Sequence, residues 1–149
     1  MFSSEEFLNQ QTIDTKLETA FSPIPAGEYV GMLSKLEAKE QPKTDGTGHW
    51  TIVDLFWAID DARAKEATGM ESPQIKDSVF LDMENGKLAT GKNKNIQLGR
   101  YLEALGLNGV PGNPFAAMRG KAAKLQVTVE PDKKDPTRVF NRVKAVGKL

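Results

Sequence analysis

The segment Gly86–Asn93, GKLATGKN, has the spacing of a phosphate-binding loop except at its last residue. Such a loop reads Gly, four residues, Gly-Lys and then Ser or Thr, whose hydroxyl reaches Mg²⁺. Here Asn93 stands in the final place. A strand-like run over residues 78–83 precedes the segment, and a helix-like run over residues 95–106 follows it. The spacing alone therefore suggests a nucleotide site. Whether it is one depends on the secondary structure around the segment.

The setting argues against a nucleotide site. A phosphate-binding loop of this kind belongs to a parallel sheet with crossover helices, whereas this chain has one clear helical pattern among strands that read as antiparallel neighbours. We interpret the segment as a basic, glycine-rich loop that leads into a helix. Lys92 and Lys94 then stand at the positive end of that helix, where a DNA phosphate is a suitable anion. A nucleotide-dependent enzyme remains an alternative, which a binding assay with labelled ATP and Mg²⁺ would test.

The composition removes most other catalytic chemistry. The chain has no Cys and a single His, His49, so thiol catalysis, disulfides, Cys-ligated zinc and a His-rich metal site are excluded. Carboxylates such as Asp54 and Asp60 are frequent, but no pair has a spacing typical of general acid–base catalysis. The sequence predicts a binding protein rather than an enzyme, with no catalytic residue, no metal and no cofactor.

The last predicted strand carries a different chemistry. Arg138, Phe140, Arg142 and Lys144 share one parity, so they project from one side of a strand. Proteins that bind single-stranded nucleic acid combine cations, which follow the phosphates, with rings, which stack on bases of any kind. The alternative is an ordinary solvated face in which Phe140 covers the end of a barrel.

Side chains elsewhere extend this predicted surface. Further candidate cations are Lys35, Lys92, Lys94 and Lys124, and candidate stacking rings from the first two strands are Tyr29, Trp50 and Phe56. Each ring also has a packing interpretation. The charge distribution favours a polyanionic partner for the second half of the chain, because residues 1–75 carry a net charge of −7 and residues 76–149 a net charge of +7. Variation of charge along any soluble chain is the simpler alternative.

The elements that must position these residues follow from hydrophobic periodicity. We expect an arm over residues 1–22 and one domain over residues 23–149. The expected strands are 27–38, 49–60, 75–83, 121–130 and 138–147, with a helix over 93–106. A five-stranded antiparallel barrel with a helix between its third and fourth strands is the plan of the OB-fold. We therefore predict a closed OB-fold barrel.

The predicted faces of the first two strands are assigned by alternation. In the second strand Val53, Leu55, Trp57 and Ile59 are expected to face the core. In the first strand the pattern groups Val30, Met32 and Leu36 on one face, and Tyr29, Leu33 and Lys35 on the other.

The arm is expected to begin with a short helix, because Ser3 or Ser4 can cap it and Glu5 and Glu6 follow in its first turn. It packs either on its own domain or on a neighbouring copy, which would give a homo-oligomer. No apolar run approaches the length of a membrane span, and no signal-like segment precedes the domain. We therefore expect no membrane partner and a cytoplasmic location.

Several motifs together resemble the small OB-fold single-stranded DNA-binding proteins of bacteriophages. They are the Pro-x-Gly-Glu-Tyr run within PIPAGEYVGML, the Gly-Lys-x-x-Asn-x-x-Leu-Gly-Arg helix within GKNKNIQLGRYLEALGLN, and the closing Asn-Arg-Val-Lys strand. The strands HWTIVDLFWAID and GKAAKLQVTVE lie between them in the same order. The resemblance extends from about residue 23 to the end of the chain.

The resemblance implies a noncatalytic protein that coats and protects single-stranded DNA during phage replication and recombination, in the cytoplasm of the host. It also implies phage or host replication and recombination proteins as partners. One feature departs from many single-strand binders, which end in an acidic tail that recruits other proteins, whereas this chain ends in the basic run AVGKL. The rival hypothesis is a small β-barrel that serves as a virion component or as an inhibitor of a host enzyme.

Overall fold

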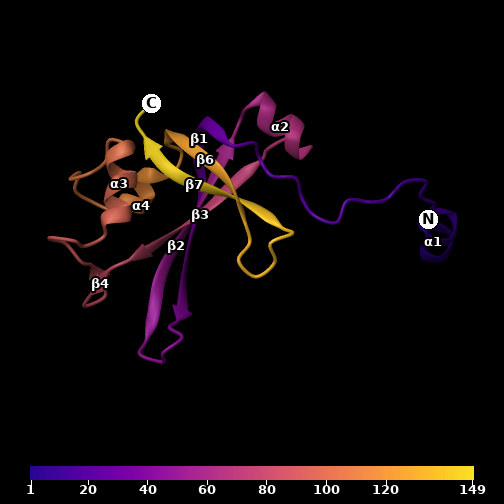
Figure 1. The fold of residues 1–149 in the computed structure, drawn as a ribbon. Helices are drawn as coiled ribbons and strands as arrows, with labels where there is room; N and C mark the ends of the chain where they lie inside the picture. The colour runs from indigo at the N-terminus through magenta and orange to yellow at the C-terminus, as the bar shows by residue number, and fades with distance from the viewer.

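The computed structural model describes residues 1–149 and is mainly β (Figure 1). Five antiparallel strands form one sheet in the order β3-β2-β1-β6-β7. They are β1 (Gly27–Pro42), β2 (His49–Ile59), β3 (Gln74–Leu81), β6 (Ala122–Pro131) and β7 (Val139–Gly147). A small hairpin, β4 (Met83–Glu84) and β5 (Lys87–Leu88), follows β3. The helices are α1 (Ser4–Gln10), α2 (Ala62–Thr68), α3 (Ile96–Ala104) and α4 (Pro114–Met118).

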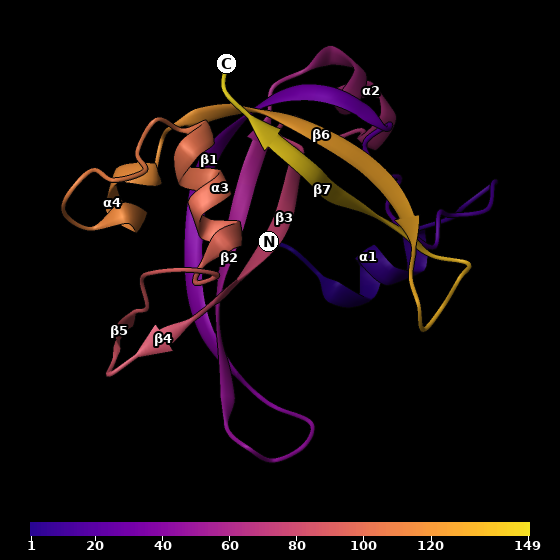
Figure 2. The ribbon, with the colours of Figure 1, turned by 60° about the vertical axis from the view of Figure 1, so that its left-hand side comes forward.

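The sheet is strongly curved but open. β3 and β7 are its two edges, and no hydrogen-bonded ladder joins them. They nevertheless approach each other, and α3 contacts both of them (Figure 2). The prediction of a closed barrel is therefore wrong in this respect, because the β3–β7 pairing that would complete it is missing.

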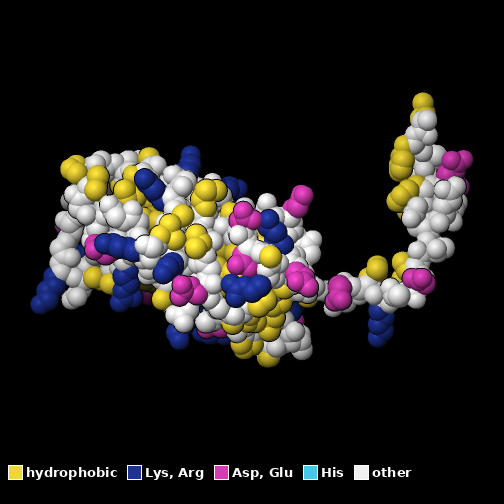
Figure 3. All heavy atoms as spheres, turned by 90° about the horizontal axis from the view of Figure 1, so that it is seen from above, with side chains coloured by type: hydrophobic (Ala, Val, Ile, Leu, Met, Phe, Trp, Pro, Cys, Tyr) yellow, Lys and Arg dark blue, Asp and Glu magenta, His cyan; other side chains and the backbone are white.

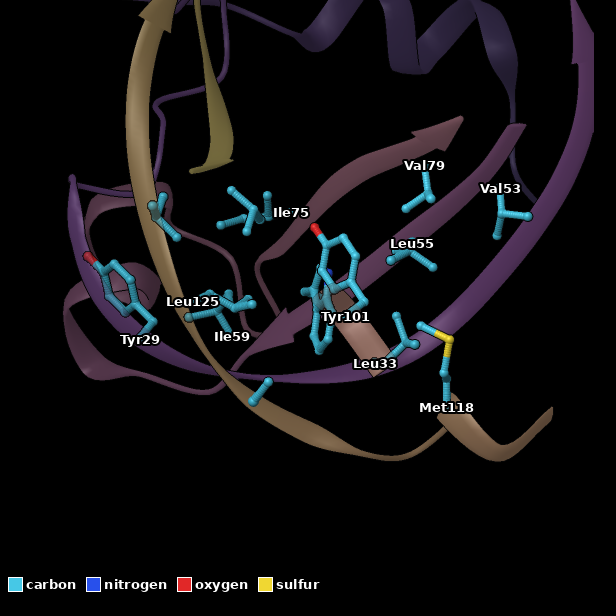
Figure 4. Close-up of a cluster of buried hydrophobic side chains, with 14 of the residues drawn as sticks. Tyr29, Leu33, Val53, Leu55, Ile59, Ile75, Val79, Tyr101, Met118 and Leu125 are labelled. Atoms are coloured by element: carbon cyan, nitrogen blue, oxygen red, sulfur yellow. The ribbon is translucent and has the colours of Figure 1, made fainter. Parts of the chain in front are cut away.

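The concave side of the sheet encloses the core, which Figure 4 shows in close-up. Val53, Leu55, Trp57 and Ile59 of β2 are all buried, which confirms the predicted alternation of that strand. The α3 helix adds Tyr101, whose ring stacks on the Trp57 ring with centroids 5.9 Å apart. Because both large rings lie at the centre, α3 is fixed against the sheet at a defined position.

β1 changes face in the middle. Its pairing with β2 shifts register between Leu33 and Lys35, which is the signature of a β-bulge. As a result Leu33 and Leu36 both pack against the core, three positions apart. The prediction that Leu36 shares a face with Val30 and Met32 is therefore wrong, since strict alternation does not survive an extra residue.

Close packing explains one glycine of β1. A Cβ on Gly31 would lie 2.4 Å from Cδ1 of Leu125 in the neighbouring strand β6. A side chain at Gly31 would therefore have to displace the buried side chain of Leu125.

The polar stretch after β2 contains α2, a helix that is not among the expected elements. Asp61 caps this helix by accepting a hydrogen bond from the backbone N–H of Arg63 at 2.8 Å, and Gly69 ends it with a φ of 68°. Both are standard helix boundary residues. None of the four helices has the length and apolar character needed to cross a lipid bilayer.

The arm, residues 1–22, extends away from the sheet (Figures 1 and 3). Every one of its residues is exposed, and Ser3 caps α1, as predicted, by accepting from the N–H of Glu6. The arm is attached at Ile24, which is buried. Asn141 of β7 holds Ile24 from both sides, because its Oδ1 accepts from Ile24 N and its Nδ2 donates to Ile24 O, each at 2.8 Å.

Candidate nucleic-acid interface

The convex side of β1, β2 and β3 presents rings and cations together. We call this surface the outer face, and it comprises Lys35, Glu37, Lys39, Gln41, Lys43, Trp50, Ile52, Asp54, Phe56, Lys76, Ser78 and Phe80. These positions alternate with the buried residues of the same strands, so the pleat that fills the core also aims them outward. The rings and cations meet because antiparallel register aligns the three strands.

Two exposed rings lie at the end of the outer face nearest the β1–β2 connection. Trp50 and Phe80 lie edge to face, with ring centroids 5.6 Å apart and an interplanar angle of 79°. They remain 42% and 46% exposed, although Ile52, which pairs with Phe80 across the strands, is buried. The two rings are thus held in place by buried neighbours and remain accessible to solvent, as rings that stack on bases must be.

Cations lie over the rings of the outer face. The Lys43 ammonium is 4.5 Å from the centroid of the Trp50 ring, and the Lys35 ammonium is 5.3 Å from that of Phe56. Both distances fall within the range of cation–π attraction. Lys35 also pairs with Glu37 at 2.7 Å, whereas Lys43 and Lys76 have no carboxylate partner within 4.0 Å.

Asp54 of β2 is one of two acidic residues on the outer face, and it pairs across the strands with the other, Glu37 of β1. Burial opposes its ionisation, but a hydrogen bond from Ser78 Oγ at 2.6 Å and the Lys39 ammonium at 3.1 Å outweigh burial, so the pKa of Asp54 is lowered. The carboxylate is therefore ionised, compensated by the Lys39 ammonium and only 8% exposed. It orients Lys39 along the face instead of presenting a free negative charge.

A hollow of about 480 Å³ continues the outer face across the open edge of the sheet. We call it the seam, because it lies between β3 and β7. Its lining consists of Lys76, Asp77, Ser78, Phe80, Gln97, Phe140, Asn141 and Arg142. The ring of Phe140, which is 47% exposed, thus joins the same surface as Phe80. The missing β3–β7 ladder is what leaves room for this hollow.

The floor of the seam contains a half-buried acid, Asp77. The Tyr101 hydroxyl donates a hydrogen bond to Asp77, and the backbone N–H of Ser78 donates to the other carboxylate oxygen at 3.1 Å. Burial raises the pKa of Asp77 to about 6, although the Ser78 bond and the Arg142 charge oppose that rise. Asp77 therefore links the seam to the Tyr101–Trp57 stack in the core.

Five of the predicted site residues lie on the outer face or in the seam. Trp50, Phe56 and Lys35 lie on the outer face, and Phe140 and Arg142 line the seam. Arg142 also faces Glu130 at 3.6 Å.

Tyr29 is buried, and its prediction as a stacking ring is wrong. Its ring is 2% exposed, its hydroxyl donates to the carbonyl of Pro25 at 2.6 Å, and the Arg63 guanidinium covers the ring at 4.6 Å. Tyr29 shares the core-facing parity of Leu33, so the pleat turns it inward. Its role is to hold the segment that joins the arm to β1.

The remaining predicted cations lie elsewhere on the surface. Lys92 and Lys94 are in the loop before α3. Lys124 of β6 lies 3.9 Å from Glu28 of β1, and Arg138 pairs with Asp135 in the turn before β7. A register shift in the β6–β7 pairing places Lys144 in a bulge, beside the end of α3. The predicted single row from Arg138 to Lys144 is therefore broken at Lys144. In Figure 3 acidic side chains also stand among the basic ones.

Sequence reasoning missed Phe80, Lys76 and Lys43. The parity of β3 contains the signal, because Ile75, Val79 and Leu81 are buried and the residues between them must point outward. No such signal exists for Lys43, whose position over Trp50 depends on how the β1–β2 connection folds back.

No cluster of three His, Cys, Asp or Glu side chains converges on a point in the structure. Residues 86–93 contain β5 and part of the turn that leads into α3, and they do not link parallel strands. Comparison of this chain with models of protein families and with curated protein sequences finds no match.

Proposed function

We propose that this protein binds single-stranded DNA noncatalytically, with little sequence preference, along the outer face and the seam. The observation that carries this proposal is the exposed Trp50–Phe80 pair with the Lys43 ammonium above the Trp50 ring. Stacked rings and adjacent cations are the two components by which proteins hold single strands. The resemblance to phage single-stranded DNA-binding proteins supports the same function, in DNA replication and recombination.

We further propose that the open sheet is an OB-fold with its last pairing unformed. The strand order β3-β2-β1-β6-β7, with α3 preceding β6 in the chain, is compatible with that fold, which is often only partly closed. OB-folds bind single strands across their second and third strands. The outer face occupies the corresponding strands, β2 and β3, which supports assigning DNA to it.

Low sequence preference follows from the lining of the seam. The polar side chains that would read a base are already occupied, since Gln97 bonds to Ser78 and Phe80 and Asn141 bonds to Ile24. Rings and cations remain, and these do not distinguish bases. The binding partner is therefore proposed to be any single strand rather than one motif.

The test is fluorescence anisotropy of a labelled oligo-dT against a salt series. Affinity should fall linearly with the logarithm of salt concentration, because phosphate contacts release counterions. Trp50→Ala and Phe80→Ala should each weaken binding by about 1–3 kcal/mol, the value of one stacked base. Phe2→Ala, which removes an exposed ring from the arm, is the matched control and should leave affinity unchanged.

The proposal fails if the wild-type protein does not bind at low salt. It also fails in its location if both ring variants bind as the wild type does. The rival structural role predicts assembly of the protein without DNA and no anisotropy change on its addition. Equal binding of a duplex of the same length would remove the preference for single strands.

A further inference from the structure

The arm carries the largest group of uncovered apolar side chains in the molecule. Met1, Phe2, Phe7, Leu8, Ile13, Leu17 and Phe21 are 47% exposed or more. Apolar side chains grouped in this way mark a contact surface. The domain of the same chain covers none of them, and the arm points to the side opposite α3 (Figure 1). A second molecule is therefore the natural partner of the arm.

The first turns of the arm are amphipathic and acidic. At 3.6 residues per turn, Phe7 and Leu8 fall on one side of α1, and Glu5 and Glu6 lie at the two edges of that side, next to Leu8 and Phe7 respectively. The Phe2 ring packs against Phe7 with centroids 5.6 Å apart, which widens the apolar side. The whole arm has four acidic residues and one basic residue, Lys16, and these are visible on it in Figure 3.

A complementary groove lies along α3. This α3 groove, a hollow of about 510 Å³, has an apolar floor of Leu88, Ile96, Leu98 and Leu102 and a basic rim of Lys94 and Arg100. Ile96 is 49% exposed, and neither rim cation has a carboxylate within 4.0 Å. The acidic side chain in the lining, Glu103, is already engaged by Lys148 at 4.0 Å and by Asn108 at 3.3 Å.

Hydrogen bonds within the molecule fix the shape of the α3 groove before any partner binds. Asn95 ties the loop before α3 to the β4–β5 hairpin by donating to the carbonyls of Asp82 and Ala89 at 2.9 and 2.8 Å. The wall that carries Leu88 is thus fixed relative to Ile96. A preorganised apolar groove with a basic rim suits an acidic amphipathic helix, which binds by laying its apolar side into the groove.

We propose that α1 of one molecule docks in the α3 groove of a second copy. Phe7 and Leu8 cover Ile96 and Leu102, and Glu5 and Glu6 face Lys94 and Arg100. The contact is head to tail, so each copy offers one arm and one groove, and copies can link into a chain or a ring. This self-association does not rest on the proposed function, because neither partner surface belongs to the outer face or the seam.

The test is sedimentation velocity of the full chain without nucleic acid, over a wide concentration series. The wild-type protein should sediment above its monomer mass of 16.4 kDa as concentration rises. Two variants should each remain monomeric: Phe7→Ala/Leu8→Ala in the arm, and Ile96→Glu in the groove. Neither change threatens the fold, since the arm is exposed, Ala favours the helix, and an acidic residue suits the first turn of α3.

Mixing the two variants gives the decisive result. The arm variant retains a groove and the groove variant retains an arm, so the mixture should form dimers that go no further. Val30→Glu, at an exposed apolar position of β1, is the control and should associate as the wild type does. A monomeric wild type at every concentration, a mixture without dimers, or association lost only in Val30→Glu would each overturn the proposal.

Discussion

Asn95 and Asp82 hold each other through three hydrogen bonds. The N–H of Asp82 donates to Asn95 Oδ1 at 2.7 Å, the N–H of Asn95 donates to Asp82 Oδ2 at 2.8 Å, and Asn95 Nδ2 donates to Asp82 O at 2.9 Å. Asn95 adopts a φ of 50°, a left-handed conformation that Asn tolerates better than most residues. The glycine- and lysine-bearing loop is therefore closed by an amide–carboxylate clasp, with no hydroxyl required.

Replacement of Asn95 by Ala should destabilise the domain by about 2–4 kcal/mol, because it removes the clasp and leaves a left-handed Ala. Urea denaturation measures the change. Asn95→Gly is the informative companion, since it removes the side-chain bonds but relieves the conformational strain, and it should recover about 1 kcal/mol. Equal losses in the two variants would show that the strain contributes nothing.

The half-buried acid Asp77 should make stability depend on pH. Its pKa of about 6 in the folded state exceeds the ordinary value of 3.8, so the folded state holds the proton more tightly than the unfolded state. Its contribution to stability is present in full below the ordinary value and is lost as pH rises through about 6. The loss is at most about 3 kcal/mol, and partial exposure of the group reduces it.

Asp77→Asn should remove this pH dependence and keep the hydrogen bond from Tyr101, because the amide oxygen can still accept it. Urea midpoints of the wild type and the variant, compared across this pH interval, measure the effect. A wild-type stability that increases across the interval, with no change in the variant, would contradict the assigned direction.

Two cations of β7, Arg142 and Lys144, should contribute unequally to DNA affinity. Arg142→Ala should weaken binding to all single strands alike and reduce the salt slope by about 0.7, because it removes one phosphate contact in the seam. Lys144→Ala should have little effect, since the bulge directs Lys144 to the end of α3. Lys124→Ala is the matched control on β6. Equal losses of affinity in the Arg142 and Lys144 variants would contradict this result and favour the single row of cations predicted from the sequence.

Tyr29→Phe should leave DNA affinity unchanged and lower stability by about 1 kcal/mol, the typical value of one hydrogen bond. Its ring remains in the core, and only the bond to the Pro25 carbonyl is lost. Anisotropy and urea denaturation measure the two effects separately. A loss of DNA affinity without a loss of stability would instead indicate that Tyr29 contacts DNA.

The sequence was most informative where a single strand determines its own environment. In β2 the positions Val53, Leu55, Trp57 and Ile59 alternate without interruption, and their burial follows. The bulge near Ser34 could not be predicted in this way. It arises because β1 pairs with β6 only as far as Met32 and continues alone beside β2, which is a property of the whole sheet.

The candidate site was predictable in part, for related reasons. Trp50 and Phe140 lie at outward positions of strands whose parity is clear, whereas Tyr29 belongs to a strand with apolar residues on both faces. Phe80 could have been assigned from the parity of β3. The seam could not, since it exists only because two distant strands, β3 and β7, approach without pairing.

The two tryptophans give this protein an internal optical contrast. Trp57 is fully buried in the core, and Trp50 is 42% exposed on the outer face. Because the chain contains no other Trp, its fluorescence is the sum of one shielded and one accessible indole. A soluble quencher such as iodide reaches Trp50 alone, so protection from quenching reports occupancy of the outer face. Loss of the shielded, blue-shifted fraction reports unfolding of the core, and one unlabelled sample yields both readings.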